Sequence, residues 1–188
     1  VTGVQTCALP IYRAAAVKTL QKIGMYEVAA HERVLTRHAL RRLQKLDGLT
    51  LYGQQDPSLK RDRIGVIAMN AANLSHGKLA AALGYEWGIG VRNGCFCAQP
   101  YVRTLLGVSE EEMTDVVNKL AAGDHATVPG MVRMSLGIYN NKEEVDRFVD
   151  ALESILENGP RADYVVHPEH HDYVPAGHTP RYEPHSPV

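Results

Sequence analysis

Residues that could support nucleophilic chemistry gather in one short segment, which reads GVRNGCFCAQP from Gly90 to Pro100. Cysteine acts as a nucleophile through its thiolate, and a nearby cation or a helix N-terminus favours that form. Arg92 supplies a cation, and the proline can occupy the first turn of a helix, where its missing N–H is not needed. The residues alone leave two roles open for Cys95 and Cys97: a reactive thiol, or a small buried hydrophobic side chain, which is the more common role.

The histidines do not point to a second chemical site. None of the nine has the spacing of a structural metal site, which argues against a bound metal. His76 follows a predicted helix cap and is expected at the surface. In the proline-rich C-terminal part we expect solvated side chains or weak adventitious metal binding, at His167, His170, His171, His178 and His185.

The composition is that of a soluble globular protein. Hydrophobic residues make up 45% and charged residues 22% of the 188 residues, which allows one domain with a core. The formal net charge of -1 gives no electrostatic reason to expect a nucleic acid or a membrane as a partner. The apolar runs fall short of the roughly 20 residues that span a bilayer. Three cysteines cannot form a disulfide framework, so a reducing cytoplasm is the expected compartment.

The first stretch of the chain stands apart from the rest. Residues 1–11 read VTGVQTCALPI, show neither helical nor strand periodicity, and lack the basic start of a signal peptide. A common sequencing-adapter oligonucleotide encodes this stretch residue for residue, and its last base can begin the codon for Tyr12. We therefore interpret residues 1–11 as an adapter artefact, give Cys7 no functional weight, and expect coding sequence upstream to be missing.

Two helices are predicted next. An Ala-rich helix covers residues 13–23 and ends at a glycine. A long amphipathic helix follows, with apolar residues at three- and four-residue steps: Met25, Val28, Leu35, Ala39, Leu43 and Leu46. Its arginines are expected on a solvated face: Arg33, Arg37, Arg41 and Arg42.

Shorter helices and strands alternate in the remainder. Helices are predicted after Ser75, over residues 100–106, over residues 109–122 from a capping box, and from Asn141. The last of these has an apolar face that must be covered, made of Val145, Phe148, Val149, Leu152, Ile155 and Leu156. Strands are predicted over 49–52, 64–69, 88–92 and 131–138.

The end of the chain differs in composition. From residue 159 onward six prolines interrupt any helix and little apolar surface remains. Residues 159–188 are therefore expected to form a loosely ordered tail, with one short extended piece at 164–166. The whole pattern predicts an α/β or α+β fold in which helices cover a small sheet.

The cysteine segment resembles the cysteine-bearing loop of the cysteine desulfurase and selenocysteine lyase group, within the class V aminotransferase family. That loop typically has an arginine, a glycine two positions on, and a cysteine followed by alanine and proline. The matching residues are Arg92, Gly94, Cys97, Ala98 and Pro100. Histidines commonly precede the family's cysteine, whereas this chain has Cys95 and Phe96, a version similar to that of molybdenum-cofactor sulfurase-like relatives. The resemblance implies that Cys97 is the nucleophile.

A second segment, VRMSLGIYN at residues 132–140 followed by EEVD at 143–146, resembles the family's final strand-to-helix segment. The family's arginine in this segment binds the substrate α-carboxylate, and Arg133 takes that position. A planar guanidinium suits this role because it donates two parallel, charge-assisted hydrogen bonds to a carboxylate. The alternative is a structural salt bridge at a strand edge. We assign Arg92 to substrate binding together with Arg133.

The resemblance covers residues 13–157 and implies a fold-type I enzyme that uses pyridoxal 5'-phosphate and is usually a homodimer. Residues 12–158 then belong to the C-terminal small domain. In that plan the lysine and the aspartate that hold the coenzyme lie upstream, in the large domain. Neither is identifiable here, so the chain by itself is expected to be inactive.

By the same resemblance, Arg133 holds the carboxylate of an amino-acid substrate while the Cys97 thiolate attacks the substrate sulfur. The thiol becomes a persulfide, alanine is released, and a sulfur-acceptor protein is a further expected partner. Cys95 is assigned to packing first, ahead of a sulfur relay or a resolving thiol.

Two other functions remain open from the sequence. One is a class V enzyme, such as an aminotransferase or an epimerase, that does not use Cys97 chemically. The other is a non-enzymatic module that binds a metal or a partner through Cys95, Cys97 and the C-terminal histidines. Sulfide release by a Cys97→Ala variant distinguishes the first alternative from a desulfurase. Zinc titration of the chain tests the second alternative.

Overall fold

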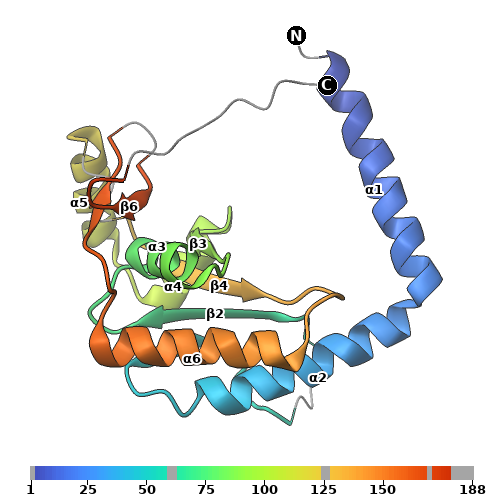
Figure 1. Cartoon of the computed structure of the whole chain (residues 1–188). Coiled ribbons are helices and arrows are strands. Elements are labelled where there is room, and N and C mark those ends of the chain that lie inside the picture. The colour runs from blue at the N-terminus through green and yellow to red at the C-terminus, as the bar shows by residue number, and fades with distance from the viewer. Residues whose placement is uncertain (1–2, 59–62, 124–127, 169–170, 179–188) are drawn as a thin grey trace.

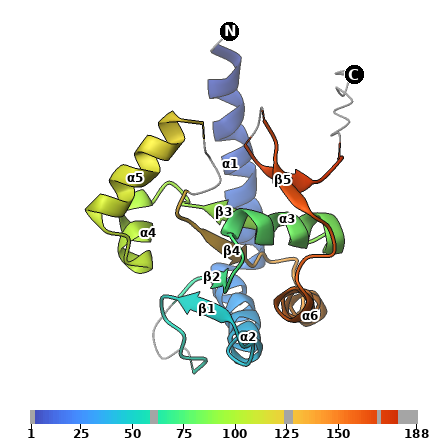
Figure 2. The same cartoon turned by 90° about the vertical axis from the view of Figure 1, so that its left-hand side faces the viewer.

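The computed structural model describes residues 3–58, 63–123, 128–168 and 171–178. Two helices come first, α1 (Gly3–Ile23) and α2 (Met25–Leu43). A four-stranded antiparallel sheet follows, and its spatial order is β1 (Leu49–Tyr52), β2 (Val66–Ala71), β4 (Met131–Ser135) and β3 (Arg92–Gly94). The other elements are α3 (His76–Trp87), α4 (Gln99–Leu106), α5 (Glu110–Ala121), α6 (Lys142–Asn158), β5 (Tyr164–Val166) and β6 (Tyr173–Pro175). Helices around a small sheet confirm the predicted fold class (Figures 1 and 2).

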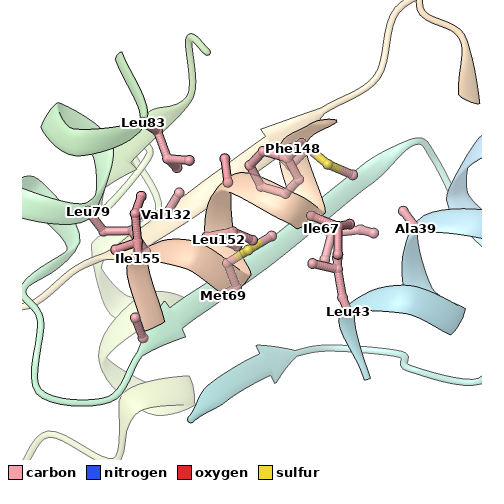
Figure 3. Packing of buried hydrophobic residues seen from close by; sticks show 14 of the residues in the cluster. Ala39, Leu43, Ile67, Met69, Leu79, Leu83, Val132, Phe148, Leu152 and Ile155 are labelled. Carbon is pink, nitrogen blue, oxygen red and sulfur yellow. The ribbon is translucent and has the colours of Figure 1, made fainter. Parts of the chain in front are cut away.

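The two faces of the sheet differ because side chains alternate along each strand. On β2, Ile67, Met69 and Ala71 are buried, whereas the residues between them are half-buried. The buried set joins apolar side chains of α2, α3 and α6 in one core (Figure 3). On the opposite face, the described part of the chain leaves a pocket between the strands, α4 and the loop before it.

Helix α6 supplies a large share of the core. Its predicted apolar stripe is confirmed, because the side chains from Val145 to Ile155 at helical spacing are buried against the sheet and α2. Burying one such side chain is worth about 1.5–3 kcal/mol. The predicted stripe of α2 is confirmed from Val28 to Leu43, but Met25 is 57% exposed. Met25 follows directly after Gly24, where the chain turns from α1 into α2.

Charged side chains join α2 to α6 beside the core. The Arg42 guanidinium donates to Asp146 at 2.6 Å and to Asp150 at 2.7 Å. His38 Nε2 lies 2.7 Å from the same Asp146 oxygen. The prediction that the arginines of α2 share one solvated face is therefore wrong for Arg42, which is half-buried between two helices.

Two strands differ in extent from their predictions. The strand predicted over 88–92 begins only at Arg92, because Gly88 adopts a left-handed conformation that caps the end of α3. The strand predicted over 131–138 ends at Ser135. A turn follows, in which Gly137 donates its N–H to the Asn140 side chain at 2.7 Å.

The C-terminal part folds back onto α3. The extended piece predicted at 164–166 is strand β5, and it pairs with β6, which the sequence did not predict. Glu86 Oε1 accepts hydrogen bonds from the Arg161 N–H at 2.9 Å, the Ala162 N–H at 3.2 Å and the Tyr164 hydroxyl at 3.0 Å. Burial and this bond raise the pKa of Tyr164. Residues 179–188 of the predicted tail lie outside the described residues.

Helix α1 extends away from the rest of the molecule and has α2 as its neighbour (Figures 1 and 2). It begins at Gly3, whereas the sequence predicted a helix only from residue 13. The adapter origin of residues 1–11 stays a prediction. Within the described residues, every helix is too short or too polar to cross a membrane.

Candidate active site on the open face of the sheet

The accessible face of the sheet lines a pocket of about 450 Å³. The strands contribute its floor, α4 contributes one wall, and the loop that carries the cysteines contributes another. The lining residues include Tyr52, Val66, Ala68, Met131 and Arg133 from the strands, Tyr101, Val102 and Leu105 from α4, and Phe96 and Ala98 from the loop. Most of this surface is apolar or aromatic, and in such a pocket the few polar or charged groups fix the orientation of a ligand.

Arg133 is part of this floor. In the sheet it stands between Ala68 of β2 and Arg92 of β3. Its side chain is half-buried, and its Nε is buried without a hydrogen-bond partner in the described part of the chain. A guanidinium so placed can still bind an anion that enters the pocket.

Arg92 lies opposite Arg133 in the sheet. Residues directly opposite each other on antiparallel strands project to the same face, and like charges there destabilise the pair. Arg92 and Arg133 are such a pair, and Arg92 is exposed. An anion bound between or beside them would relieve the repulsion. The other pocket arginine, Arg63, instead donates to the backbone carbonyls of Gln54 and Val66, and burial lowers its pKa.

The cysteine loop forms a tight turn. The Ala98 N–H donates to the Cys95 carbonyl at 2.8 Å, and the two residues between them have positive φ angles, 55° at Phe96 and 59° at Cys97. Positive φ at both central residues describes a type I′ turn, which glycine, asparagine and aspartate usually occupy. Each such conformation costs roughly 1–2 kcal/mol for an L-residue with a side chain. Contacts elsewhere must offset this strain.

One such contact is visible. The Phe96 ring packs against the Arg133 guanidinium, with 5.0 Å between the guanidinium carbon and the ring centroid. Gly94 before the turn has a φ of 98°, as expected for the glycine that admits this bend. After the turn Ala98 occupies the N-cap position of α4, and Pro100 lies in the first turn of that helix, as predicted.

The structure therefore brings the two sequence segments together. Phe96 and Ala98, on either side of Cys97, share the pocket with Arg133. Cys97 itself is exposed at the tip of the turn, and Cys95 is half-buried. Arg92 lies beside the pocket floor through its pairing with Arg133. The chemical roles of Cys97, Arg133 and Arg92 stay predictions, but the site has the parts for a thiol to act on a carboxylate-bearing molecule.

Sequence reasoning missed the residues that support this loop. The prediction of a surface position for His76 is wrong: it is half-buried, and its Nε2 donates to the Val128 carbonyl at 2.9 Å. A Cβ atom on Gly130 would lie 2.7 Å from that nitrogen and 2.8 Å from the Gly94 Cα. Three segments distant in sequence thus meet tightly beneath the loop. A single sequence carries no signal for that contact.

The part of the chain that the structure describes does not support the hypothesis of a metal centre. Among those residues there is no group of three or more histidine, cysteine, aspartate or glutamate side chains that could hold a metal ion. His170 and His185, two of the C-terminal histidines, lie outside the described residues.

Comparison with known proteins identifies relatives of the chain. The chain is 32% identical over 155 residues to a "Probable cysteine desulfurase" of Staphylococcus epidermidis, covering 82% of this chain and 31% of that protein. It is 33% identical over 141 residues to the "Cysteine desulfurase" of Shigella flexneri, covering 75% of this chain and 28% of that one. The chain thus spans less than a third of the length of these relatives.

Solved structures give the same result. The apo cysteine desulfurase of Thermococcus onnurineus superposes with a TM-score of 0.59 at 26% identity, over 77% of this chain and 30% of that one. A cysteine desulfurase of Escherichia coli in an S-sulfonic acid form gives 0.54 at 26% identity, over 76% and 29%. The profile of the family Aminotransferase class-V matches residues 2–148. On the strength of that match and of these relatives, the chain belongs to the class V aminotransferase family.

Proposed function

We propose that this chain supplies the nucleophilic thiol and the carboxylate anchor of a pyridoxal-phosphate-dependent cysteine desulfurase. The observation that carries the proposal is the shared pocket: the turn around Cys97 and the Arg133 guanidinium meet in one cavity of about 450 Å³. The names of the relatives support the same substrate. Cysteine is a small amino acid whose carboxylate and sulfur are separated by two carbon atoms, so anchor and nucleophile must lie close together.

The residues of the pocket fit the substrate rather than the coenzyme. Arg133 can bind a carboxylate, and aromatic and apolar side chains line the pocket around it. The described lining contains neither a lysine, which would form the covalent link to the coenzyme, nor a carboxylate for its ring nitrogen. When bound, the coenzyme supplies the electron sink for the reaction. We place its anchoring residues outside this pocket, and we expect the 188-residue chain alone to show no absorption band of bound coenzyme.

Cys97 performs the sulfur transfer in this proposal. Its thiolate attacks the substrate sulfur, and a sulfur–sulfur bond forms as the substrate carbon–sulfur bond breaks. The electron pair of the broken bond stays with carbon, which takes up a proton and becomes the methyl group of alanine. The transferred sulfur is oxidised to the persulfide level and the carbon is reduced by the same two electrons. The exposed position of Cys97 suits delivery of the persulfide to an acceptor protein.

The assembly proposed with this function is a homodimer, as the family resemblance implies. Large apolar side chains are exposed on α1 and at the start of α2, including Val17, Ile23, Met25 and Tyr26, the last at 83%. Apolar surface of this kind marks contact with further protein. Light scattering coupled to size-exclusion chromatography of the enzyme that carries this segment tests the dimer, and a monomeric mass would contradict it.

The decisive experiment compares Cys97→Ala with Cys95→Ala in an enzyme that carries this segment together with its coenzyme-binding part. We expect Cys97→Ala to abolish sulfide release from cysteine and to leave the coenzyme absorbance unchanged. Cys95→Ala, two residues away in the same turn, is the matched control and should retain most of the activity. Unchanged sulfide release in Cys97→Ala would assign the chain to class V enzymes that do not use this thiol.

A further inference from the structure

We propose that Phe96 is a positioning residue, which holds the Arg133 guanidinium in place for a carboxylate and couples it to the Cys97 thiol. This inference rests on the proposed function, because it concerns the same pocket. The observation behind it is the contact between the Phe96 ring and Arg133, together with the place of Phe96 in the turn that carries Cys97.

A cation–π contact uses none of the N–H groups of the guanidinium, so these groups stay available for a ligand. An aromatic ring near a guanidinium attracts it through its π-electrons and packs on its flat surface. A carboxylate binds in the guanidinium plane, through two N–H groups at the edge. The two contacts can therefore form together. The Arg133 Nε is buried without a hydrogen-bond partner within the described part of the protein, so the contact with the Phe96 ring is one that helps to restrain the guanidinium there.

The turn makes this contact relevant to the thiol as well. Phe96 and Cys97 are the two central residues, and both have the strained positive φ. Because they are adjacent in one hydrogen-bonded turn, a ring docked on Arg133 also fixes the backbone from which the thiol projects. Loss of the ring would release both the guanidinium and the turn, so anchor and nucleophile would lose their mutual placement.

A small electrophile can measure this placement without any coenzyme. Iodoacetate carries a carboxylate next to its reactive carbon, whereas iodoacetamide is neutral and nearly the same size. The ratio of their reaction rates at Cys97, resolved from the other cysteines by peptide mass spectrometry, reports a cation near the thiol. The same ratio in the urea-unfolded chain is the reference. We expect the folded protein to favour iodoacetate on the order of tenfold over that reference, as for one charge-assisted pair.

The variants separate the inference from the function on which it rests. Phe96→Leu should lower the ratio about two- to fivefold, the range of a partly exposed cation–π contact, and Phe96→Tyr should restore it. Arg133→Gln should remove most of the preference and leave only the weaker contribution of Arg92. A wild-type ratio in Phe96→Leu, or a loss in Phe96→Tyr as large as in Phe96→Leu, overturns the role of Phe96 alone. A wild-type ratio in Arg133→Gln overturns the shared site and the proposed function with it. Circular dichroism of each variant verifies that the fold is retained.

Discussion

Arg92 and Arg133 face each other across β3 and β4, an arrangement that their like charges oppose. They differ in burial: Arg133 is half-buried on the pocket floor, and Arg92 is exposed to solvent. A charge partly shielded from water binds an anion more strongly than one that solvent and salt screen. Within the proposed function, Arg133 is therefore the principal anchor and Arg92 contributes a weaker, salt-dependent attraction.

This difference predicts unequal effects of the same substitution. Arg133→Lys should lower kcat/KM for cysteine by about 10- to 100-fold, because a lysine keeps the charge but loses the bidentate geometry. Arg92→Lys should change it by no more than about fivefold, since an exposed charge is worth at most ~1 kcal/mol. Steady-state sulfide release at two salt concentrations measures both. Equal losses in the two variants would contradict the assignment of Arg133 as the anchor.

A second prediction at this scale concerns Gly130 beneath the cysteine loop. Gly130→Ala should lower the free energy of unfolding by about 1–3 kcal/mol, because the new methyl group has only 2.7 Å to the His76 Nε2 and 2.8 Å to the Gly94 backbone. Gly84→Ala is the control: Gly84 lies within α3 with nothing inside 4 Å of the added carbon, so alanine should stabilise by up to ~1 kcal/mol. Urea unfolding curves measure both values. If Gly130→Ala left the free energy of unfolding unchanged, the segments that carry His76, Gly94 and Gly130 would be able to move apart at little cost in free energy.

At the scale of elements, the packing of α2 against α6 combines apolar burial with one ionic group. Asp146 accepts from Arg42 and lies 2.7 Å from His38 Nε2, so it links two side chains of α2 to one of α6. The hydrogen bond from Arg42, and then that with His38, lowers the pKa of Asp146 below its ordinary value of 3.8. The carboxylate is therefore favoured in the folded state.

The sign of this shift sets a pH dependence. A carboxyl group with a lowered folded-state pKa stabilises the protein fully above its unfolded value, and the contribution is lost as the pH falls through the folded value. Asp146→Asn should therefore lower the urea midpoint near neutral pH, and the gap to wild type should narrow as the pH falls below about 3.8. Glu153→Gln, on the exposed side of α6, should leave the midpoint nearly unchanged. A gap that is constant with pH would exclude the ionic contribution.

The helices and strands also show which features of the fold the sequence predicts and which it does not. Periodicity and caps located α5 and α6 because these signals are local: Ser109 with Glu112, and Asn141 with Glu144, form the predicted capping boxes. The start of β3 was misplaced because its extent depends on pairing with β4, about forty residues away in the chain. The Phe96–Arg133 contact and the space beneath Gly130 are likewise products of that register, which no local pattern encodes.

At the scale of the whole molecule, the chain after α6 returns to the body through a small number of contacts on α3. Glu86 accepts three hydrogen bonds from this returning segment, at the Arg161 and Ala162 amides and the Tyr164 hydroxyl. Arg161 also lies over the Trp87 ring at 4.5 Å, and Val174 is buried. Composition alone suggested a loosely ordered end because it counts prolines and apolar residues but not such anchors. The hairpin of β5 and β6 is thus attached to the body by the Glu86 carboxylate, by ring contacts and by the buried side chains of Tyr164 and Val174.

Glu86→Ala should loosen this hairpin while leaving the core folded. The substitution removes three hydrogen bonds, from the exposed Arg161 N–H and from the part-buried Ala162 N–H and Tyr164 hydroxyl, and a hydrogen bond contributes about 0.5–1.5 kcal/mol. That amount is a large fraction of the stability of a two-stranded hairpin but a small one of a whole domain. Limited proteolysis should therefore cut between residues 159 and 178 several-fold faster than in wild type, with the urea midpoint of the body nearly unchanged. Glu157→Ala, at the exposed end of α6, is the control, and equal cleavage of both variants would show that Glu86 does not hold the hairpin.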